Sequence, residues 1–389
     1  MSKGYGLKSK QKINHILFLV SSMDGGGAER VAALLSNHWV EQGHQVTLMP
    51  TFSGRGECLY PLNKRVRLDY LADRVGSQSR SVLNKFRRLL ALRRSIRELA
   101  PDVIVSFLPH VNVAAIIAAW GMDIPVVVSE RSYPPAMPIG PLLERLRLWT
   151  YPRANAVVVQ TEEALEWLSH YCPNAQGYVI PNPVVYPLPQ SEPKVEPASV
   201  IRPERRVVIA VGRLNEEKQF NVLLEALALL LAVFSEWDLV ILGEGSERRR
   251  LEHQCEQLGL TGRVYLPGRV GNMSDWYNRA DLFVMSSRFE GFPNTLLEAM
   301  AHGLPAVSFD CKAGPRDIIR DGVDGYLVPP KAGALGLSQT IEVLMRDDLI
   351  RHRMGEAAKS VRKRFSMARI ATKWDAILGL EITPNHGAV

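Results

Sequence analysis

Short apolar segments alternate with helical patterns along most of the chain. In the first half, segments rich in β-branched residues have the length and composition of buried strands: 13–20, 45–50, 103–107, 125–129, 156–160 and 177–180. Apolar residues recur at helical spacing in several of the intervals between them: 28–42, 82–99, 111–120 and 161–171. This alternation predicts a parallel sheet with helices wound on both faces.

A second series of the same kind follows a proline-rich stretch. Residues from Pro181 to Pro203 are dense in proline and show no periodic pattern, which is typical of a linker. Strand patterns resume at Val207 and continue at 239–242, 263–266, 281–285, 305–309 and 326–328, and helices are expected at 338–346 and 350–364. We therefore expect two α/β domains, 1–183 and 205–365, joined by a linker at 184–204.

Composition agrees with two ordinary globular domains. The chain has 389 residues, 46% of them hydrophobic and 22% charged, which excludes a disordered chain. Four cysteines form no CxxC pair and no metal-binding spacing, so reduced thiols in a cytoplasmic protein are expected. The basic leader before Ile16–Val20 imitates a signal peptide, but its apolar core is too short and lacks a cleavage pattern. The apolar stretch 111–128 is interrupted by Asp123 and Pro125, so no transmembrane helix is expected.

Two glutamates eight residues apart are the most informative candidate chemistry. Glu290 lies in a loop rich in glycine and proline, and Glu298 lies on a helix predicted from Asn294 to His302, which Asn294 would cap and Gly303 would end. The helix N-terminus offers unpaired N–H groups to a phosphate, while carboxylates can accept sugar or ribose hydroxyls. The alternative is a solvated glutamate on an amphipathic helix beside an unrelated loop glutamate.

A pair of cations follows the first strand of the second series. Arg213 and Lys218 come directly after the strand and its glycine, Gly212, where a diphosphate would lie at the carboxyl end of a parallel strand. Either cation could instead pair with the neighbouring Glu216 or Glu217.

Glycine-rich turns follow two further strands. The sequence Gly243-Glu-Gly245 is weak evidence by itself, since Gly-x-Gly is common. Asp24-Gly25-Gly26-Gly27 joins the first strand to a helix, so its backbone could approach a bound anion closely. A plain tight turn is the alternative.

Taken together, these motifs resemble the retaining glycosyltransferases of family 4. The resemblance is carried by Gly212-Arg213 with Lys218, the Gly243–Gly245 loop, the two glutamates and the segment Gly25–Arg30, and it extends from the first strand to about Phe365. It implies the GT-B fold: two Rossmann-like, doubly wound parallel-sheet domains facing an interdomain cleft, with a final helix in 366–389 packed back on the first domain. The Gly25–Arg30 segment resembles the subgroup that builds bacterial cell-surface glycans on a polyprenyl diphosphate lipid.

The resemblance also implies roles for individual residues in a hexosyltransferase. The donor would be a nucleoside-diphosphate sugar, with UDP as the expected nucleotide. Glu298 would lie at the ribose, Arg213 and Lys218 at the diphosphate, and Glu290 at the sugar. Arg269 and Val270 would lie near the base. Further donor-binding positions are Gly25, Gly26, Gly27, Gly212, Gly243, Gly245, Gly291, Phe292, Asn294 and Thr295.

Two residues of the first domain are additional candidates. His110 follows a strand and would meet the donor sugar, although a structural histidine is the alternative. Arg131 stands where some relatives carry histidine, in Ser129-Glu130-Arg131, and would bind an acceptor phosphate. Tryptophans 149, 167 and 374 are expected to pack in the core or between domains.

One predicted helix is strongly basic within a chain of net charge +7. Its Lys and Arg residues have no acid among them: Arg80, Lys85, Arg87, Arg88, Arg93, Arg94 and Arg97. Its apolar residues recur at helical spacing: Phe86, Leu89, Leu90 and Ile96. A helix docked on its own sheet, nucleic-acid binding and contact with anionic lipid are the alternatives. No nucleic-acid recognition module accompanies the charge, and contact of Arg87, Arg88 and Arg94 with lipid headgroups or a lipid diphosphate matches the resemblance.

These features predict one function for the protein, and two alternative functions remain. We expect a cytoplasmic enzyme, peripheral on the inner membrane, that glycosylates a polyprenyl-diphosphate-linked acceptor. No Asp-x-Asp motif lies at a strand end, so no obligatory metal is expected. The rivals are a nucleotide-sugar epimerase of the same fold and a non-catalytic module that binds a nucleotide sugar or lipid.

Overall fold

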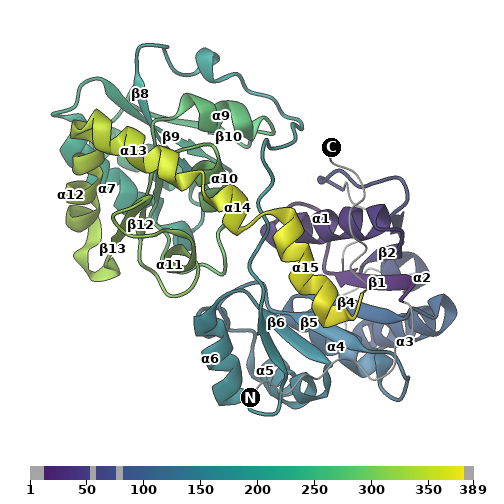
Figure 1. Cartoon of the computed structure of the whole chain (residues 1–389). Helices are drawn as coiled ribbons and strands as arrows, with labels where there is room; N and C mark the ends of the chain where they lie inside the picture. The colour runs from purple at the N-terminus through teal and green to yellow at the C-terminus, as the bar shows by residue number, and fades with distance from the viewer. Residues whose placement is uncertain (1–12, 53–57, 76–81, 381–389) are drawn as a thin grey trace. The chain divides into compact units, whose positions relative to one another are not determined.

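The chain forms two compact α/β units. The computed structural model describes residues 13–52, 58–75 and 82–380. One unit contains Met1–Pro183 and Met367–Val389, and the other contains Val184–Ser366. Each unit is built on one wholly parallel sheet that helices cover (Figure 1).

The sheet of the first unit has seven strands in the order β3-β2-β1-β4-β5-β6-β7. Its strands are β1 (His15–Val20), β2 (Gln45–Pro50), β3 (Arg67–Leu68), β4 (Val103–Phe107), β5 (Val126–Ser129), β6 (Ala156–Val159) and β7 (Gly177–Val179). Its helices are α1 (Gly27–Glu41), α2 (Leu71–Val75), α3 (Val82–Leu99), α4 (Pro109–Ala119), α5 (Pro141–Thr150), α6 (Glu162–Tyr171) and α15 (Met367–Leu378).

The last helix, α15, belongs to the core of the first unit although it follows the whole second unit in sequence. Trp374 is fully buried and its ring lies 5.8 Å from that of Phe107 on β4. Trp39 of α1 donates a hydrogen bond from Nε1 to Asp375 Oδ1 at 2.9 Å. Burial of these large rings stabilises the return of the chain to its first unit.

The sheet of the second unit has six strands in the order β10-β9-β8-β11-β12-β13. Its strands are β8 (Arg206–Val211), β9 (Trp237–Leu242), β10 (Val264–Gly268), β11 (Leu282–Met285), β12 (Ala306–Phe309) and β13 (Gly325–Val328). Its helices are α7 (Phe220–Leu231), α8 (Arg248–Gln257), α9 (Met273–Arg279), α10 (Asn294–Ala301), α11 (Pro315–Ile318), α12 (Gly333–Arg346), α13 (Asp348–Ala358) and α14 (Val361–Arg364).

In both sheets the direction in which successive strands are added reverses at the first strand, β1 in one unit and β8 in the other. In the second unit the chain moves outward from β8 to β9 and β10, then returns to β11 on the other side of β8. This is the Rossmann strand order, and ligands of such sheets bind beyond the carboxyl ends of the strands at the point of reversal. The loops after β8 and β11, and in the first unit those after β1 and β4, are therefore the expected ligand-binding loops.

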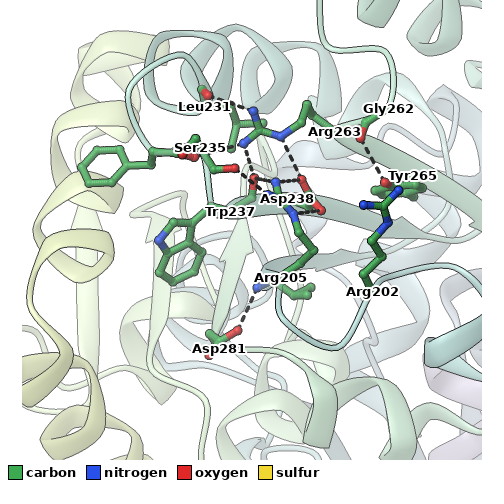
Figure 2. Close-up of polar contacts among 12 residues, drawn as sticks. Arg202, Arg205, Leu231, Ser235, Trp237, Asp238, Gly262, Arg263, Tyr265 and Asp281 are labelled. Atoms are coloured by element: carbon green, nitrogen blue, oxygen red, sulfur yellow. Dashed lines mark hydrogen bonds and ion pairs between the residues drawn. The ribbon is translucent and has the colours of Figure 1, made fainter.

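A buried acid joins the amino-terminal ends of the strands in the second unit (Figure 2). Asp238 at the start of β9 is 1% exposed and accepts hydrogen bonds from Arg205 Nε at 2.8 Å and Arg263 Nε at 2.9 Å. Arg263 also donates from Nη1 to Leu231 O at 3.1 Å. The carboxylate is thus paired on two sides, as a buried charge requires.

Several elements differ from those the sequence predicts. The short strand β3 and the helices α2, α5 and α9 were not predicted, and the helix expected at 350–364 is divided into α13 and α14. The expected linker 184–204 packs on the second unit: Val195 N donates to Asn272 Oδ1 at 3.0 Å, and Ile201 is 1% exposed. Among the described residues, no helix combines the length and apolarity needed to cross a membrane.

Candidate active site

A lysine and a glutamate form an ion pair beyond the carboxyl ends of β8 and β11, where the strand order of the second sheet reverses. Lys218 lies in the loop after β8, and Glu290 lies in the loop after β11, the strand that pairs with β8. The Lys218 ammonium Nζ is 2.6 Å from Glu290 Oε1, with side chains 20% and 10% exposed. Two further bonds join the loops: Ser286 Oγ donates to Lys218 O at 2.8 Å, and Arg288 N donates to Glu217 O at 2.8 Å.

Glycines allow the neighbouring loops to approach this ion pair closely. A Cβ on Gly212 would lie 3.2 Å from Cε of Lys218, so the lysine chain crosses the backbone there. A Cβ on Gly243, which has a φ of 143°, would lie 1.9 Å from Gly212 O, and one on Gly245 would lie 2.2 Å from Leu214 O. Backbone packing alone therefore explains Gly243 and Gly245, and their donor-binding role stays a prediction.

The second predicted cation is available for a ligand. Arg213 is exposed, and within the described part of the chain its guanidinium forms no hydrogen bond or ion pair. Pairing of the cations with Glu216 or Glu217, the alternative that the sequence left open, is not found for either of them. Glu217 instead accepts a hydrogen bond from Asn215 Nδ2 at 3.2 Å.

Glu298 is buried on the second turn of α10. Its side chain is 4% exposed, which excludes a solvated surface glutamate. The hydroxyl of the fully buried Tyr277 on α9 lies 3.3 Å from both Glu298 Oε2 and Thr295 O. Tyr277 was not predicted, because nothing in its local sequence links α9 to α10. The capping role predicted for Asn294 is wrong, since Pro293 precedes the helix and Asn294 is its first residue.

The other predicted donor-binding positions lie along the same edge of the sheet. Exposed Arg269 and mostly buried Val270 directly follow β10. Phe292 follows Gly291 in the loop before α10, and its ring packs on Phe365 with the centroids 5.5 Å apart. Gly303, with a φ of 87°, ends α10 as predicted.

In the first unit, the glycine loop follows β1 and opens α1. Gly25 has a φ of 112°, a value that favours glycine. Gly26 is the N-cap, its carbonyl accepts a hydrogen bond from the Tyr60 hydroxyl at 2.9 Å, and a Cβ there would lie 2.4 Å from Glu29 Oε2. Gly27 is the first helical residue. The loop is thus held in one conformation at the point where the first sheet reverses.

His110 lies beside this loop. It is the second residue of α4, and its Nε2 is 3.1 Å from Oγ of Ser21, which follows β1. Its ring packs edge-on against Phe52 with centroids 4.6 Å apart. Burial lowers the pKa of His110 below its ordinary value of 6.5, so the imidazole is neutral at pH 7.

Arg131 lies at the carboxyl edge of the same sheet. Its guanidinium stacks over Phe107 at 4.3 Å and donates to Asn182 Oδ1. Gln160 Nε2 also donates to that oxygen at 2.6 Å. Burial lowers the pKa of Arg131 to about 9, and the nearby Glu29 opposes the shift. Asn182 and Gln160 position Arg131 and were not predicted, because they follow different strands.

A large cavity lies away from all these residues. It measures about 1470 Å³ and is lined at the opposite, amino-terminal edge of the first sheet by residues such as Asp102, Val126 and Ala156. None of the predicted site residues lines it. The described residues also contain no cluster of three or more His, Cys, Asp or Glu side chains that could hold a metal ion.

Comparison with known proteins identifies the fold and the family. The structure of the Anabaena protein HepE in complex with UDP and glucose matches with a TM-score of 0.79 at 20% identity, covering 94% of this chain and 99% of that one. Residues 25–185 match the family model "Glycosyltransferase Family 4", and residues 191–361 match "Glycosyl transferases group 1". The chain belongs to the GT-B glycosyltransferases of family 4.

Relatives of this glycosyltransferase build bacterial surface glycans. It is 28% identical over 362 residues to the Campylobacter jejuni enzyme GalNAc-alpha-(1->4)-GalNAc-alpha-(1->3)-diNAcBac-PP-undecaprenol alpha-1,4-N-acetyl-D-galactosaminyltransferase, covering 92% of this chain and 96% of the relative. It is 27% identical over 366 residues to the amylovoran biosynthesis glycosyltransferase AmsD of Erwinia amylovora, covering 93% and 99%.

The basic helix, α3, packs on its sheet less completely than the sequence of this glycosyltransferase predicts. Ile96 is fully buried, but Phe86 and Leu90 are 57% and 49% exposed, so the predicted apolar side does not dock as a whole on the sheet. Arg88 donates to Thr51 O at 3.0 Å and Phe52 O at 3.1 Å, and so holds the end of β2 rather than projecting freely. Arg87 and Arg94 are exposed. Arg80 lies outside the described residues.

The predicted core packing is confirmed for two of the three tryptophans. Trp374 is fully buried and Trp167 is 8% exposed. Trp149 is 45% exposed on α5, so it is not a core residue.

Proposed function

We propose that this glycosyltransferase moves a hexose, with retention of configuration, from a UDP-sugar to a polyprenyl-diphosphate-linked glycan. The reaction takes place on the cytoplasmic face of the inner membrane, to which the enzyme is peripherally attached. The support comes from the geometry after β8 and β11, and from two relatives, one whose name states an undecaprenol-linked acceptor and one named for amylovoran biosynthesis.

The 2.6 Å contact between Lys218 and Glu290 is the observation that carries the proposal. Each group is already in the charge state that a sugar diphosphate requires. When the donor binds, the ammonium turns to a phosphate oxygen and the carboxylate accepts a hydroxyl of the sugar. Arg213, exposed on the same loop, adds a second positive charge at the diphosphate.

Glu298 binds the nucleoside in this proposal. Tyr277 limits the rotation of its buried carboxylate, so that it accepts ribose hydroxyls in a fixed direction. Arg269 and Val270, after β10, lie against the base. The matched structure of HepE contains UDP and glucose, which supports a uridine nucleotide as donor.

The chemical step follows from these positions. The bond between the anomeric carbon and the diphosphate oxygen breaks, and negative charge grows on the leaving phosphate, where Arg213 and Lys218 stabilise it more strongly than in the bound substrate. Glu290 stabilises the positive anomeric centre. The acceptor hydroxyl attacks from the same face, its oxygen bonds to the anomeric carbon, and its proton passes to the leaving phosphate. No metal is needed in this scheme.

The first unit binds the acceptor in this proposal. Arg131 provides a positive charge at the carboxyl edge of its sheet and binds the lipid diphosphate. The neutral His110 donates or accepts a hydrogen bond at the transferred sugar without adding charge.

A transfer assay tests the function directly. Purified enzyme is incubated with membrane extract and a panel of radiolabelled UDP-sugars, and labelled product in the organic phase from one donor is expected. The exposed Arg213→Ala change should abolish transfer without altering the circular dichroism spectrum. Chelation with EDTA should leave the rate unchanged. Donor turnover without acceptor would instead indicate an epimerase, and donor binding without any turnover would indicate a binding module.

A further inference from the structure

One face of the first unit exposes several large apolar side chains on neighbouring helices. The helices α3, α4 and α5 pack side by side, with α4 in contact with both others (Figure 1). Five large apolar residues on or next to these helices are 45% to 73% exposed: Phe86, Leu90, Trp120, Leu142 and Trp149. Isolated exposed apolar residues are normal, but several on neighbouring helices indicate an interaction surface.

On α5 the exposed residues form a single stripe. Leu142, Arg145 and Trp149 are spaced at three and four residues, so they lie along one side of the helix. Arg147 and Thr150 on the opposite side are buried. The side of α5 that faces solvent is therefore apolar and basic, the reverse of the polar stripe that a solvated helix presents.

The two tryptophans form an ordered cluster with an arginine. The rings of Trp120, directly after α4, and Trp149 lie 5.0 Å apart, and the Arg153 guanidinium lies 5.2 Å and 4.4 Å from their centres. Arg153 also donates to the carbonyl of Trp149. Arg93 of α3 donates to Trp120 O at 2.8 Å and so fixes the end of α4. Contacts within the protein thus orient the two rings, although both are about half exposed.

The charge around these residues is predominantly positive. The exposed basic side chains on the three helices and the turn after α5 are Lys85, Arg87, Arg94, Arg97, Arg145 and Arg153. Two of the nearby acids are already paired: Glu98 with Arg74 at 2.6 Å, and Glu144 with Arg147 at 2.5 Å. Asp123, three residues after Trp120, is an exposed acid in the same region, but the six basic residues outnumber it, so an anionic partner would meet a net positive charge.

We propose that this face is the membrane-binding surface of the enzyme, with Trp120 and Trp149 inserted among the headgroups of an anionic bilayer. Tryptophan favours that interface, because its ring is apolar and its N–H is polar, and arginines beside it pair with lipid phosphates. The proposal rests on the lipid-linked acceptor of the proposed function and deepens it. It assigns membrane attachment to α5 and the Trp120–Trp149–Arg153 cluster as well as to the basic helix α3.

Vesicle co-sedimentation tests the surface. The full chain is mixed with vesicles of phosphatidylcholine alone, or of equal parts phosphatidylcholine and phosphatidylglycerol. We expect binding to the mixed vesicles only. The double change Trp120→Ser with Trp149→Ser should weaken binding by at least about tenfold, because two half-exposed rings no longer enter the interface. Arg97→Gln with Arg145→Gln should weaken it by about thirtyfold, since each basic residue contributes about fivefold and the two contributions multiply.

Controls separate this inference from the proposed function. Leu229 and Leu349 of the second unit are 55% and 84% exposed, so Leu229→Ser with Leu349→Ser removes comparable apolar surface elsewhere and should leave vesicle binding unchanged. Each variant is also assayed for sugar transfer in detergent with a short-chain, water-soluble acceptor. The surface variants should retain that transfer.

The outcomes are distinct. Vesicle binding that is lost in both surface variants but kept in the control supports the proposal. Wild-type-like binding by the surface variants, equal binding to both kinds of vesicle, or an equal loss in the control overturns it. If the wild-type enzyme shows no sugar transfer in detergent, the proposed function is overturned, while the membrane-binding proposal is still decided by the vesicle experiment.

Discussion

The two cations of the site differ in what their removal should do to the fold. Lys218 contacts Glu290 at 2.6 Å, whereas the side chain of Arg213 has no partner among the described residues. We predict that Lys218→Met destabilises the second unit and that Arg213→Met does not, while both changes abolish or strongly reduce sugar transfer. The contrast separates a structural effect from a catalytic one within a single loop.

The magnitude follows from the geometry of the pair. At 2.6 Å the attraction is about 6 kcal/mol for an effective dielectric constant near 20, before desolvation is subtracted. Because the two side chains are 20% and 10% exposed, the pair lies between a surface and a buried ion pair, and removing the cation should cost about 1–3 kcal/mol. Arg213→Met should change the free energy of unfolding by less than about 0.5 kcal/mol.

Thermal unfolding measures this difference. A cost of 1 kcal/mol lowers Tm by about 2–4 °C for a unit of this size. The trace is fitted with two transitions, because a chain of two units need not unfold in one step. The double variant Lys218→Met with Glu290→Gln should recover most of the lost stability, since no unpaired carboxylate remains, but it should not recover transfer.

Two results would refute this reasoning. One is an equal fall in Tm for Lys218→Met and Arg213→Met. The other is a double variant that is no more stable than Lys218→Met, because the cost of that change would then not come from leaving the Glu290 carboxylate unpaired.

Three further predictions concern other parts of the molecule. Glu298→Gln should raise the KM for the donor by about 10- to 100-fold with little change in Tm, since a hydrogen bond to a charged group is weakened. An unchanged KM would contradict the proposed contact between Glu298 and the ribose. Asp238→Asn should destabilise by about 3–5 kcal/mol, because the buried carboxylate loses the charge that pairs with Arg205 and Arg263. Glu342→Gln, at the exposed pair with Arg346, should cost under about 1 kcal/mol, and chemical denaturation compares the two variants. The pKa of His110 is lowered in the fold, so the unfolded chain binds more protons and stability should decrease as pH falls through about 6.5. His110→Gln should flatten that dependence between pH 5 and 7, and an identical profile would contradict the assigned burial.

All strands except the short edge strand β3 were predictable, because parallel strands are buried on both faces and therefore appear as apolar runs. Helices with a regular apolar stripe were predictable for a similar reason. Helix α5 was not predicted, because its solvent-facing side carries Leu142 and Trp149 and so blurs the contrast between apolar and polar sides. The same feature makes α5 part of the proposed membrane surface.

The proline-rich stretch 184–204 shows the limit of local composition. Proline density correctly excludes a regular helix or strand over most of it. Whether such a segment is a free tether depends on partners distant in sequence, and here Asn272 and Ser274 bind its backbone.

By itself the sequence determined the two βα series and the glycosyltransferase family. It also placed Arg213, Lys218, Glu290 and Glu298 on loops and a helix after parallel strands, because strand burial and glycine turns are recorded in local patterns. Only the tertiary structure decided which of these groups touch. It joined Lys218 to Glu290 across 72 residues, placed the Tyr277 hydroxyl on Glu298, and left Trp149 half exposed beside Trp120. Such contacts depend on strand order and helix packing, which no local pattern of residues specifies.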